Sequence, residues 1–282
     1  MKYLEVEFLI DKHEESVDLL AAMIGDIVFE AFVSSDHVLK GYIQQPLFSE
    51  ELLNAVINDF PFADTKITYS VCEVEDKNWN QAWENEGFQP IIIGEECTIH
   101  DGRHLPALPT PIQIEIDAKQ AFGTGTHETT RLIISYLLRE NLLGKRVLDC
   151  GCGTGILSIA ASKLGAESIT AYDIDKWSVD NTLHNASINC VNSCISVHHG
   201  DVSILDQITD YYDLIMANIN RNILLNDMPA MRKKLSERGK LLLSGFYEDD
   251  VAMLVAKASS LQMELIDTRI DNQWSMAVFK PI

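Results

Sequence analysis

The stretch that decides the fold is VLDCGCGTGIL, residues 147–157. An apolar run ending in Asp149 leads into a loop with glycine at every second position, and residues 157–164 are expected to form a helix. The glycines keep the loop free of side chains, so a ligand can lie against its backbone. Dinucleotide-binding loops have the pattern G-x-G-x-x-G, whereas Ile156 makes this one D-x-G-x-G-x-G. The loop therefore predicts a strand–loop–helix cofactor site of a different kind.

Polar residues also end the three apolar runs that follow. Asp173 ends the run 168–173, Asp201 follows a run ending at His199, and Asn218 ends the run 212–218. Open α/β sheets bind ligands at the carboxyl ends of their strands, and an acid placed like Asp173 suits the two hydroxyls of a ribose. No Lys or Arg stands among these residues, so the rim is acidic. Such a rim would not neutralise the negative charge of a pyrophosphate. It suits a cationic, phosphate-free nucleoside such as S-adenosylmethionine.

A second glycine-containing segment, AFGTGTHETT, covers residues 121–130. It combines glycines and threonines just before an expected helix, residues 129–141, and can close over the methionine end of the cofactor. The alternative is a plain helix-capping turn.

The D-x-G-x-G-x-G loop with the later acid resembles the class I S-adenosylmethionine-dependent methyltransferases. Over its whole length the chain resembles one family, the ribosomal protein L11 methyltransferases. The residues that carry this resemblance are 121–127, Thr129-Thr130, 149–157, Asp173-Ile174-Asp175 and Ala217-Asn218-Ile219. The family's Asp-Pro-Gly before the 121–127 loop is here Asp117-Ala118-Lys119, its proline after the loop histidine is Glu128, and Asn220-Arg221 follow Ile219.

The resemblance implies an α/β fold: a Rossmann-like class I methyltransferase domain with a mostly parallel, doubly wound sheet, preceded by a small ferredoxin-like α+β domain. It implies that methyl groups pass from S-adenosylmethionine to lysine side chains and the N-terminal amine of ribosomal protein L11, which the N-terminal domain holds. It also implies cofactor contacts for Thr130, Gly151, Asp173 and Asn218. The expected cofactor site further includes Phe122, Thr126, Asp149, Gly153 and Asp201.

The order of expected elements in residues 1–76 is β-α-β-β-α-β, which is typical of a ferredoxin-like unit. Strands are expected at 2–10, 26–33, 37–45 and 66–75, and helices at 14–24 and 49–60, the second with Leu52, Leu53, Val56 and Ile57 facing inward. We place a ferredoxin-like substrate-recognition domain at 1–76, a linker at 77–110 and the methyltransferase domain at 111–282.

The net charge of −20 is unevenly distributed. Residues 1–90 hold 18 acids and 5 bases, and residues 91–282 hold 24 acids and 17 bases. An acidic first third repels a nucleic acid backbone and attracts a basic protein, although acidity also aids solubility alone. We expect no direct nucleic acid contact, no membrane span and a cytoplasmic location. The six cysteines form no C-x-x-C pair, which favours reduced thiols and no metal site.

Two residues are candidates for the chemistry. Asn218 can orient the acceptor amine through a carbonyl oxygen, and His127 is a weaker candidate for removing a proton, since a capping or packing role competes with it. Three other functions are considered. A nucleic-acid amino methyltransferase would carry two prolines after Asn218, where this chain has Ile219-Asn220. An NAD-dependent dehydrogenase is disfavoured by Ile156, and a non-catalytic binding protein by the intact set of site residues.

Overall fold

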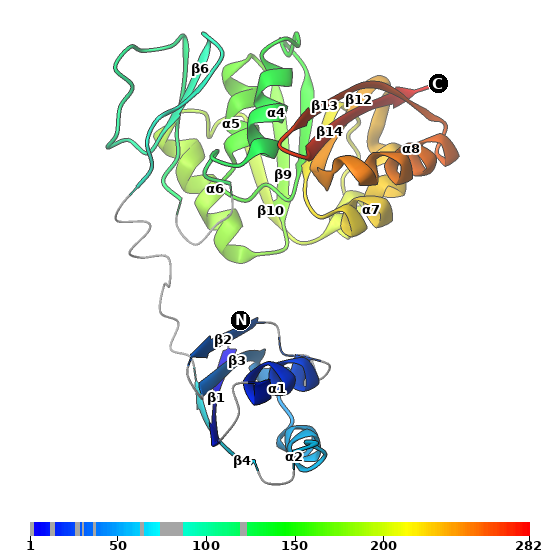
Figure 1. The fold of residues 1–282 in the computed structure, drawn as a ribbon. Helices are drawn as coiled ribbons and strands as arrows, with labels where there is room; N and C mark the ends of the chain where they lie inside the picture. Colours follow the sequence, from blue (N-terminus) through cyan, green and yellow to red (C-terminus); the bar gives the residue numbers. More distant parts are fainter. Residues whose placement is uncertain are drawn as a thin grey trace. The chain divides into compact units, whose positions relative to one another are not determined.

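The computed structural model describes residues 3–11, 15–25, 29, 31–35, 38–62, 65–73, 87–118 and 123–282. The chain divides into two compact units, Met1–Trp79 and Asn80–Ile282 (Figure 1). Each unit has a hydrophobic core of its own.

The first unit is the predicted ferredoxin-like domain. Its antiparallel sheet has the strand order β2-β3-β1-β4, and two helices separate the strands along the chain. Its elements are β1 (Tyr3–Asp11), α1 (Glu15–Gly25), β2 (Ala31–Ser35), β3 (Val38–Gln44), the 3-10 helix η1 (Gln45–Leu47), α2 (Glu50–Asn58) and β4 (Lys66–Glu73).

Buried apolar side chains alternate with more exposed side chains along β1, and the buried ones form part of this small core. Val6 and Phe8 are fully buried, whereas Glu5 and Glu7, on the opposite face, both lie within salt-bridge distance of Lys40. Leu53 of α2 is fully buried, but Leu52 is 53% exposed, so the prediction that Leu52 faces inward is wrong. A residue next to Leu53 lies about 100° around the helix, outside the stripe that repeats every three or four residues.

The second unit contains a seven-stranded sheet with the order β10-β9-β8-β11-β12-β14-β13. All neighbouring pairs from β10 to β12 are parallel, and β14 is antiparallel to both of its neighbours. The strands are β8 (Arg146–Cys150), β9 (Ser168–Asp173), β10 (Ile195–His199), β11 (Tyr212–Asn218), β12 (Leu235–Tyr247), β13 (Met263–Asp271) and β14 (Trp274–Pro281).

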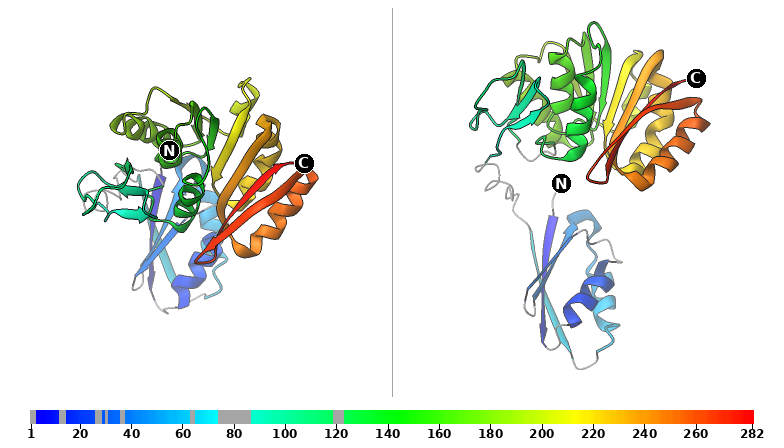
Figure 2. Two further views of the ribbon diagram at one scale, coloured as in Figure 1. Left: turned by 90° about the horizontal axis from the view of Figure 1, so that it is seen from above. Right: turned by 45° about the horizontal axis from the view of Figure 1, so that its top comes forward.

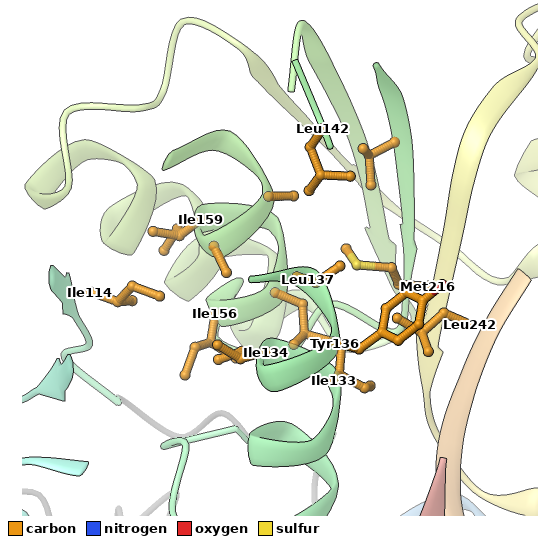
Figure 3. Packing of buried hydrophobic residues seen from close by; sticks show 14 of the residues in the cluster. Ile114, Ile133, Ile134, Tyr136, Leu137, Leu142, Ile156, Ile159, Met216 and Leu242 are labelled. Atoms are coloured by element: carbon orange, nitrogen blue, oxygen red, sulfur yellow. The ribbon is translucent and has the colours of Figure 1, made fainter. Parts of the chain in front are cut away.

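Helices cover both faces of this sheet, as Figures 1 and 2 show. Their bounds are α4 (Glu128–Leu137), α5 (Ile156–Lys163), α6 (Lys176–Ile188), α7 (Arg221–Lys234) and α8 (Val251–Ser260), with the 3-10 helices η2 (Val202–Asp206) and η3 (Glu248–Asp250) between them. Val147 and Met216 point into the core with α4, α5 and α6, whereas their neighbours Leu148 and Ala217 point into the core with α7 and α8. Figure 3 shows the first of these cores, where residues of α4 and α5 meet Met216 and Leu242. The doubly wound, mostly parallel sheet predicted from the sequence is confirmed.

The strand order reverses at β8. The chain goes from β8 to β9 and β10 on one side, then crosses to β11 and β12 on the other. A crevice therefore forms at the carboxyl ends of β8 and β11, which is where doubly wound sheets bind ligands. The glycine loop, residues 151–155, leaves β8 at this point.

A third, three-stranded sheet precedes α4. It consists of β5 (Ile91–Ile93), β6 (Cys97–His100) and β7 (Ile112–Glu115), and its residues Ile99 and Ile114 are fully buried in the core that contains α4 and α5. Part of the range 77–110, treated above as a linker, thus forms strands that pack on the second unit. The three-part division of the chain stays a prediction.

Asparagines of α6 and of its C-terminal cap hold this additional sheet in place. Asn189 accepts a hydrogen bond from the Glu115 N–H at 3.0 Å and donates one to the Glu115 carbonyl at 2.6 Å. Asn185 accepts from the Asp117 N–H at 3.0 Å, and Asn181 donates to the Asp117 carbonyl at 2.8 Å. Because these asparagines are four residues apart, they lie on one face of the helix and satisfy the backbone groups of Glu115, at the end of β7, and of Asp117 just after it. Among the described residues, no helix has the length and apolar character needed to cross a bilayer.

Candidate active site

Asp149, in β8, is buried beneath the glycine loop. Its Oδ2 accepts hydrogen bonds from the Ser158 backbone N–H at 3.1 Å and from the Ser158 hydroxyl at 2.6 Å. Its Oδ1 is also buried and has no hydrogen-bond partner among the described residues. Burial, with a further contribution from the charge of Asp173, raises the pKa of Asp149 to about 6. An unpaired carboxylate oxygen is therefore buried beneath the glycine loop, where a cationic group would compensate it.

The glycine loop needs its glycines for two separate reasons. Gly151, Gly153 and Gly155 all have positive φ, at 73°, 54° and 79°, which L side chains rarely adopt. Space is also short, since a Cβ on Gly155 would stand 2.7 Å from the methyl of Thr182, and one on Gly151 would collide with the side chain of Ile219. The bare backbone of the loop thus packs against α6 and against the residue that follows Asn218.

Asp173, at the end of β9, is tied to the glycine loop. Its Oδ2 accepts a hydrogen bond from the Gly153 N–H at 2.9 Å, and its Oδ1 accepts one from the Asp175 N–H at 2.9 Å. The two bonds fix the carboxylate, and each oxygen keeps a lone pair that can accept from a hydroxyl. The residue is 9% exposed, so this carboxylate faces a largely enclosed space.

Asp201 lies beyond the next strand. The Gly200 N–H donates to the Asp173 carbonyl at 2.9 Å, which brings the end of β10 beside the end of β9. The Asp201 side chain is exposed and caps η2 by accepting from the Ser203 N–H at 2.9 Å. Hydrogen bonds from Ser203 lower the pKa of Asp201 below its usual value. It is an ionised group at the outer rim of the crevice.

Thr130 and Asn218 meet on the other side of the crevice. The amide Nδ2 of Asn218 lies 3.5 Å from the hydroxyl of Thr130, at the limit of a hydrogen bond. This contact joins the first turn of α4 to the end of β11. Because Nδ2 faces Thr130, the amide oxygen of Asn218 is the atom that can accept a hydrogen bond from a ligand.

His127 caps α4. Its Nδ1 accepts a hydrogen bond from the Thr129 N–H at 3.3 Å and lies 2.9 Å from the Thr129 hydroxyl. Its ring meets the ring of Trp274 edge-on, with the centroids 4.6 Å apart. This geometry is that of a capping and packing histidine, and the use of Nδ1 as an acceptor places the proton of the neutral ring on Nε2.

The threonine-rich loop docks on the glycine loop. The Thr154 hydroxyl donates to the Gly123 carbonyl at 2.6 Å, and Gly125 packs between Ile99 and Ile156. The hydroxyls of Thr124 and Thr126 lie 2.9 Å apart near the surface. Phe122, the last of the predicted site residues, lies outside the described residues.

Two supports of the site were not found from the sequence. Thr182 and Asn185 of α6 donate to the carbonyls of Gly153 and Thr154, at 2.8 and 2.9 Å, and so hold the glycine loop. Asn181, Asn185 and Asn189, at four-residue spacing in α6 and its cap, were the available signal.

The second missed support is the hairpin between β13 and β14. Arg131 of α4 bonds Asp271 at 3.1 Å, and the amide of Asn272 donates to Glu128 at 3.2 Å. Asn272 and Gln273 both have positive φ, as in a type I′ turn. An Asn in a short polar break between two alternating apolar runs was the signal for this turn.

The crevice has the features that a bound S-adenosylmethionine requires. The buried free oxygen of Asp149 suits a cationic amino group, the fixed carboxylate of Asp173 suits a ribose, and the glycines keep the loop between them free of side chains. The sheet order, the D-x-G-x-G-x-G loop at the switch point and the acid after the next strand together define a class I S-adenosylmethionine-dependent methyltransferase.

Comparison with known sequences gives the family. The profile described as "Ribosomal protein L11 methyltransferase (PrmA)" matches residues 15–281, and the chain belongs to this family. A protein of Phocaeicola vulgatus named ribosomal protein L11 methyltransferase is 46% identical over 280 residues, covering 99% of each chain. A protein of the same name from Bacteroides fragilis is 44% identical, with the same coverage.

A solved structure supports the fold. The ribosomal protein L11 methylase of Lactobacillus delbrueckii subsp. bulgaricus superimposes with a TM-score of 0.63 at 28% identity. The superposition covers 69% of this chain and 99% of that one. Family membership therefore confirms the resemblance stated from the sequence.

Proposed function

We propose that this chain transfers methyl groups from S-adenosylmethionine to lysine side chains and to the N-terminal amine of ribosomal protein L11. The observation that supports this most strongly is the likeness, over 99% of the chain, to relatives that are named for methylation of that protein. The free carboxylate oxygen of Asp149 and the acidic rim agree with a cationic cofactor and a cationic acceptor.

The proposal gives the site residues these roles. Asp173 binds the ribose hydroxyls, Asp149 compensates the amino group of the methionine part, and the Gly151 and Gly153 backbone lies against the cofactor. Thr130, Thr126 and Phe122 close over it, and Asp201 borders its outer end. When bound, S-adenosylmethionine supplies a methyl group from its positively charged sulfur, and the transfer leaves this sulfur as a neutral thioether.

The acceptor amine has to be neutral when it attacks. A free lysine has a pKa of about 10.4, so deprotonating it at neutral pH costs roughly 4 kcal/mol. Enclosure in the crevice lowers this cost, because burial disfavours the ammonium form. The amide oxygen of Asn218 accepts a hydrogen bond from the amine and aims its lone pair. His127 is the weaker candidate for taking the proton, since its Nδ1 already caps α4.

The proposal also assigns the ferredoxin-like unit to holding the basic substrate. Glu50, Glu51 and Asp59 are exposed along α2 and at its end, while Glu5 and Glu7 are paired with Lys40. Glu50 also accepts a hydrogen bond from the Tyr69 hydroxyl at 3.3 Å. Exposed carboxylates of this kind attract a basic protein and repel RNA. A cytoplasmic location fits the six free cysteines.

A titration of S-adenosylmethionine tests the cofactor site. Asp173→Ala should weaken binding at least about tenfold, because hydrogen bonds to a charged group are lost. Asp175→Ala is the matched control: Asp175 caps α6 by accepting from the Ser178 N–H at 3.0 Å, and its loss should leave binding nearly unchanged. Equal affinities of the Asp173 variant and the wild type would overturn the ribose assignment.

Mass spectrometry tests the acceptor. Purified L11 incubated with the chain and S-adenosylmethionine should gain whole methyl groups, and peptide mapping should place them on lysine side chains and the N-terminal amine. Methyl groups on any other atom of L11 would contradict the proposed chemistry.

Kinetics test the role of the acidic unit. The triple variant Glu50→Gln, Glu51→Gln, Asp59→Asn should raise KM for L11 several-fold at low salt, and the difference should shrink as salt screens the charges. The control triple Glu167→Gln, Asp206→Asn, Glu237→Gln removes three exposed charges from the other unit. If both triples behave alike, net charge alone explains the effect and α2 holds nothing.

A further inference from the structure

Three aromatic side chains from distant parts of the second unit form one cluster. The rings of Tyr247 and Trp274 are 4.3 Å apart between centroids and tilted by 34°. The ring of His127 stands 4.6 Å from that of Trp274 at 70°. Tyr247 ends β12, Trp274 begins β14, and His127 caps α4. We call His127, Tyr247 and Trp274 the aromatic wall.

The aromatic wall stands at the edge of the sheet that carries Asn218. In the register of the sheet, Asn218 pairs with Ser244, and Tyr247 follows three residues later, less than about 10 Å further along β12. Gly245, at the bulge between them, packs so closely on the backbone of Ile219 that no side chain fits there. On the other side, His127 lies three residues before Thr130, the partner of Asn218. The wall therefore borders the acceptor side of the crevice.

The rings are not part of a hydrophobic core. Neither core of the second unit includes them; Tyr247 is 50% exposed, the His127 side chain is 48% exposed, and Trp274 is half-buried. Partly exposed aromatic rings that lie together beside a site can offer a binding surface.

The surroundings of the wall are acidic. Glu128 and Asp271 flank His127 and Trp274 in sequence, and Glu248 and Asp249, just after Tyr247, are exposed. Arg131 forms ion pairs with both Glu128 and Asp271, so these two carboxylates share one cation. Asp250 is paired with Arg221 at 2.6 Å. The excess of negative charge favours a cationic occupant.

We propose that the aromatic wall is where the acceptor lysine docks, with its carbon stem packed along the rings and its ammonium or methylated ammonium held by the ring faces and the surrounding carboxylates before the neutral amine moves on to Asn218. This rests on the proposed function, because it names where the acceptor of that reaction lies. Ring faces attract ammonium ions and hold N-methylated ones well, since these shed water easily. The wall thus serves substrate and partly methylated product alike, and Asn218 acts further in.

Kinetics with L11 test the wall through matched pairs of variants. Trp274→Leu and Tyr247→Leu remove a ring, whereas Trp274→Phe and Tyr247→Phe keep one. We expect kcat/KM for L11 to fall about tenfold in each Leu variant and to recover within about threefold in its Phe counterpart, the size of a cation–π contact. Affinity for S-adenosylmethionine should not change. Tyr211→Leu, an exposed tyrosine at the opposite edge of the sheet, is the control.

The product pattern adds a readout that a structural role would not move. Without a ring, partly methylated amines leave early, so the Leu variants should accumulate monomethyl and dimethyl products. Equal loss of activity in the Leu and Phe variants, with an unchanged product pattern, would overturn the proposal.

A binding measurement separates this proposal from the proposed function. The chain has four tryptophans, so the indole N–H signal of Trp274 can be assigned in a nitrogen-15 spectrum through Trp274→Phe. Titration with a capped Nε-trimethyllysine should shift that signal, and its capped neutral isostere, with a tert-butyl group in place of the trimethylammonium, should not. A shift without methylation of L11 would refute the proposed function and support the wall. No selective shift would refute the wall even if L11 is methylated.

Discussion

Replacing Asp149 by Asn tests whether the site keeps a buried carboxylate at a cost in stability. Burial, aided by the charge of Asp173, raises the pKa of Asp149 from 3.8 to about 6. The folded chain therefore holds this proton more tightly than the unfolded chain does, and the free energy of unfolding falls as the pH rises through this range. A pKa difference of this size corresponds to about 3 kcal/mol once the pH is above about 6.

The variant keeps an amide oxygen for Ser158 but has no charge to bury, so it lacks this pH dependence. About half of the penalty is already present at about pH 5, and the stability of Asp149→Asn relative to the wild type should therefore grow by about 1.5 kcal/mol between about pH 5 and pH 8. Urea unfolding across this range measures the difference. Asp206→Asn, which removes an exposed charge of the same unit, should show no such trend. A stability difference that does not change with pH would refute the reasoning.

The same variant should lose cofactor affinity while it gains stability. The free oxygen of Asp149 is assigned to the cationic amino group of S-adenosylmethionine, and a charge-assisted hydrogen bond of this kind changes the dissociation constant by roughly tenfold or more. Isothermal titration at neutral pH measures it. Unchanged affinity would contradict the assigned role of Asp149.

Three further results are expected. Gly151→Ala should destabilise the chain by about 2–5 kcal/mol, because the new side chain meets a positive φ and collides with Ile219. Gly144→Ala, where φ is positive but the space is open, should destabilise it by only about 1–2 kcal/mol. Equal losses of stability in urea unfolding would exclude a contribution from the collision. Asn185→Ala should lower the stability by about 2–5 kcal/mol and should also lower cofactor affinity, because Asn185 supports the glycine loop. Asn189→Ala should lower the stability alone. A loss of cofactor affinity in Asn189→Ala as large as that in Asn185→Ala would contradict the role given to Asn185. Burial raises the pKa of the Cys150 and Cys152 thiols, so a thiol reagent should label these two residues only after unfolding. The exposed Cys72 and Cys190 should be labelled in the native chain. Rapid labelling of Cys152 in the native chain would disprove that the two thiols are enclosed.

Most of the fold can be predicted from the sequence, because local patterns dominate it. The alternation in β1, the apolar runs that become β8, β9 and β11, and the glycine loop each identify an element without tertiary information. Leu52 shows the limit: on a short helix, one residue of phase error exchanges a buried for an exposed side chain.

The site divides in the same way. Asp149, Gly151, Asp173 and Asn218 follow strands, so the switch-point rule places them together. The contact of Trp274 with His127 depends on the antiparallel strand β14, which returns from the far edge of the sheet, and no local pattern reports that pairing. The strands β5 and β6, of three and four residues, are too short for their periodicity to stand out. Such parts depend on contacts between residues far apart in the chain.

The most direct test of the proposed function is the transfer of labelled methyl groups from S-adenosylmethionine to purified L11, with ribosomal RNA present as a competing acceptor. The proposed function predicts label on the amines of L11, none on the RNA, and loss of the signal in Asp173→Ala. Label on the RNA, or none on L11 although the chain binds S-adenosylmethionine, would contradict it.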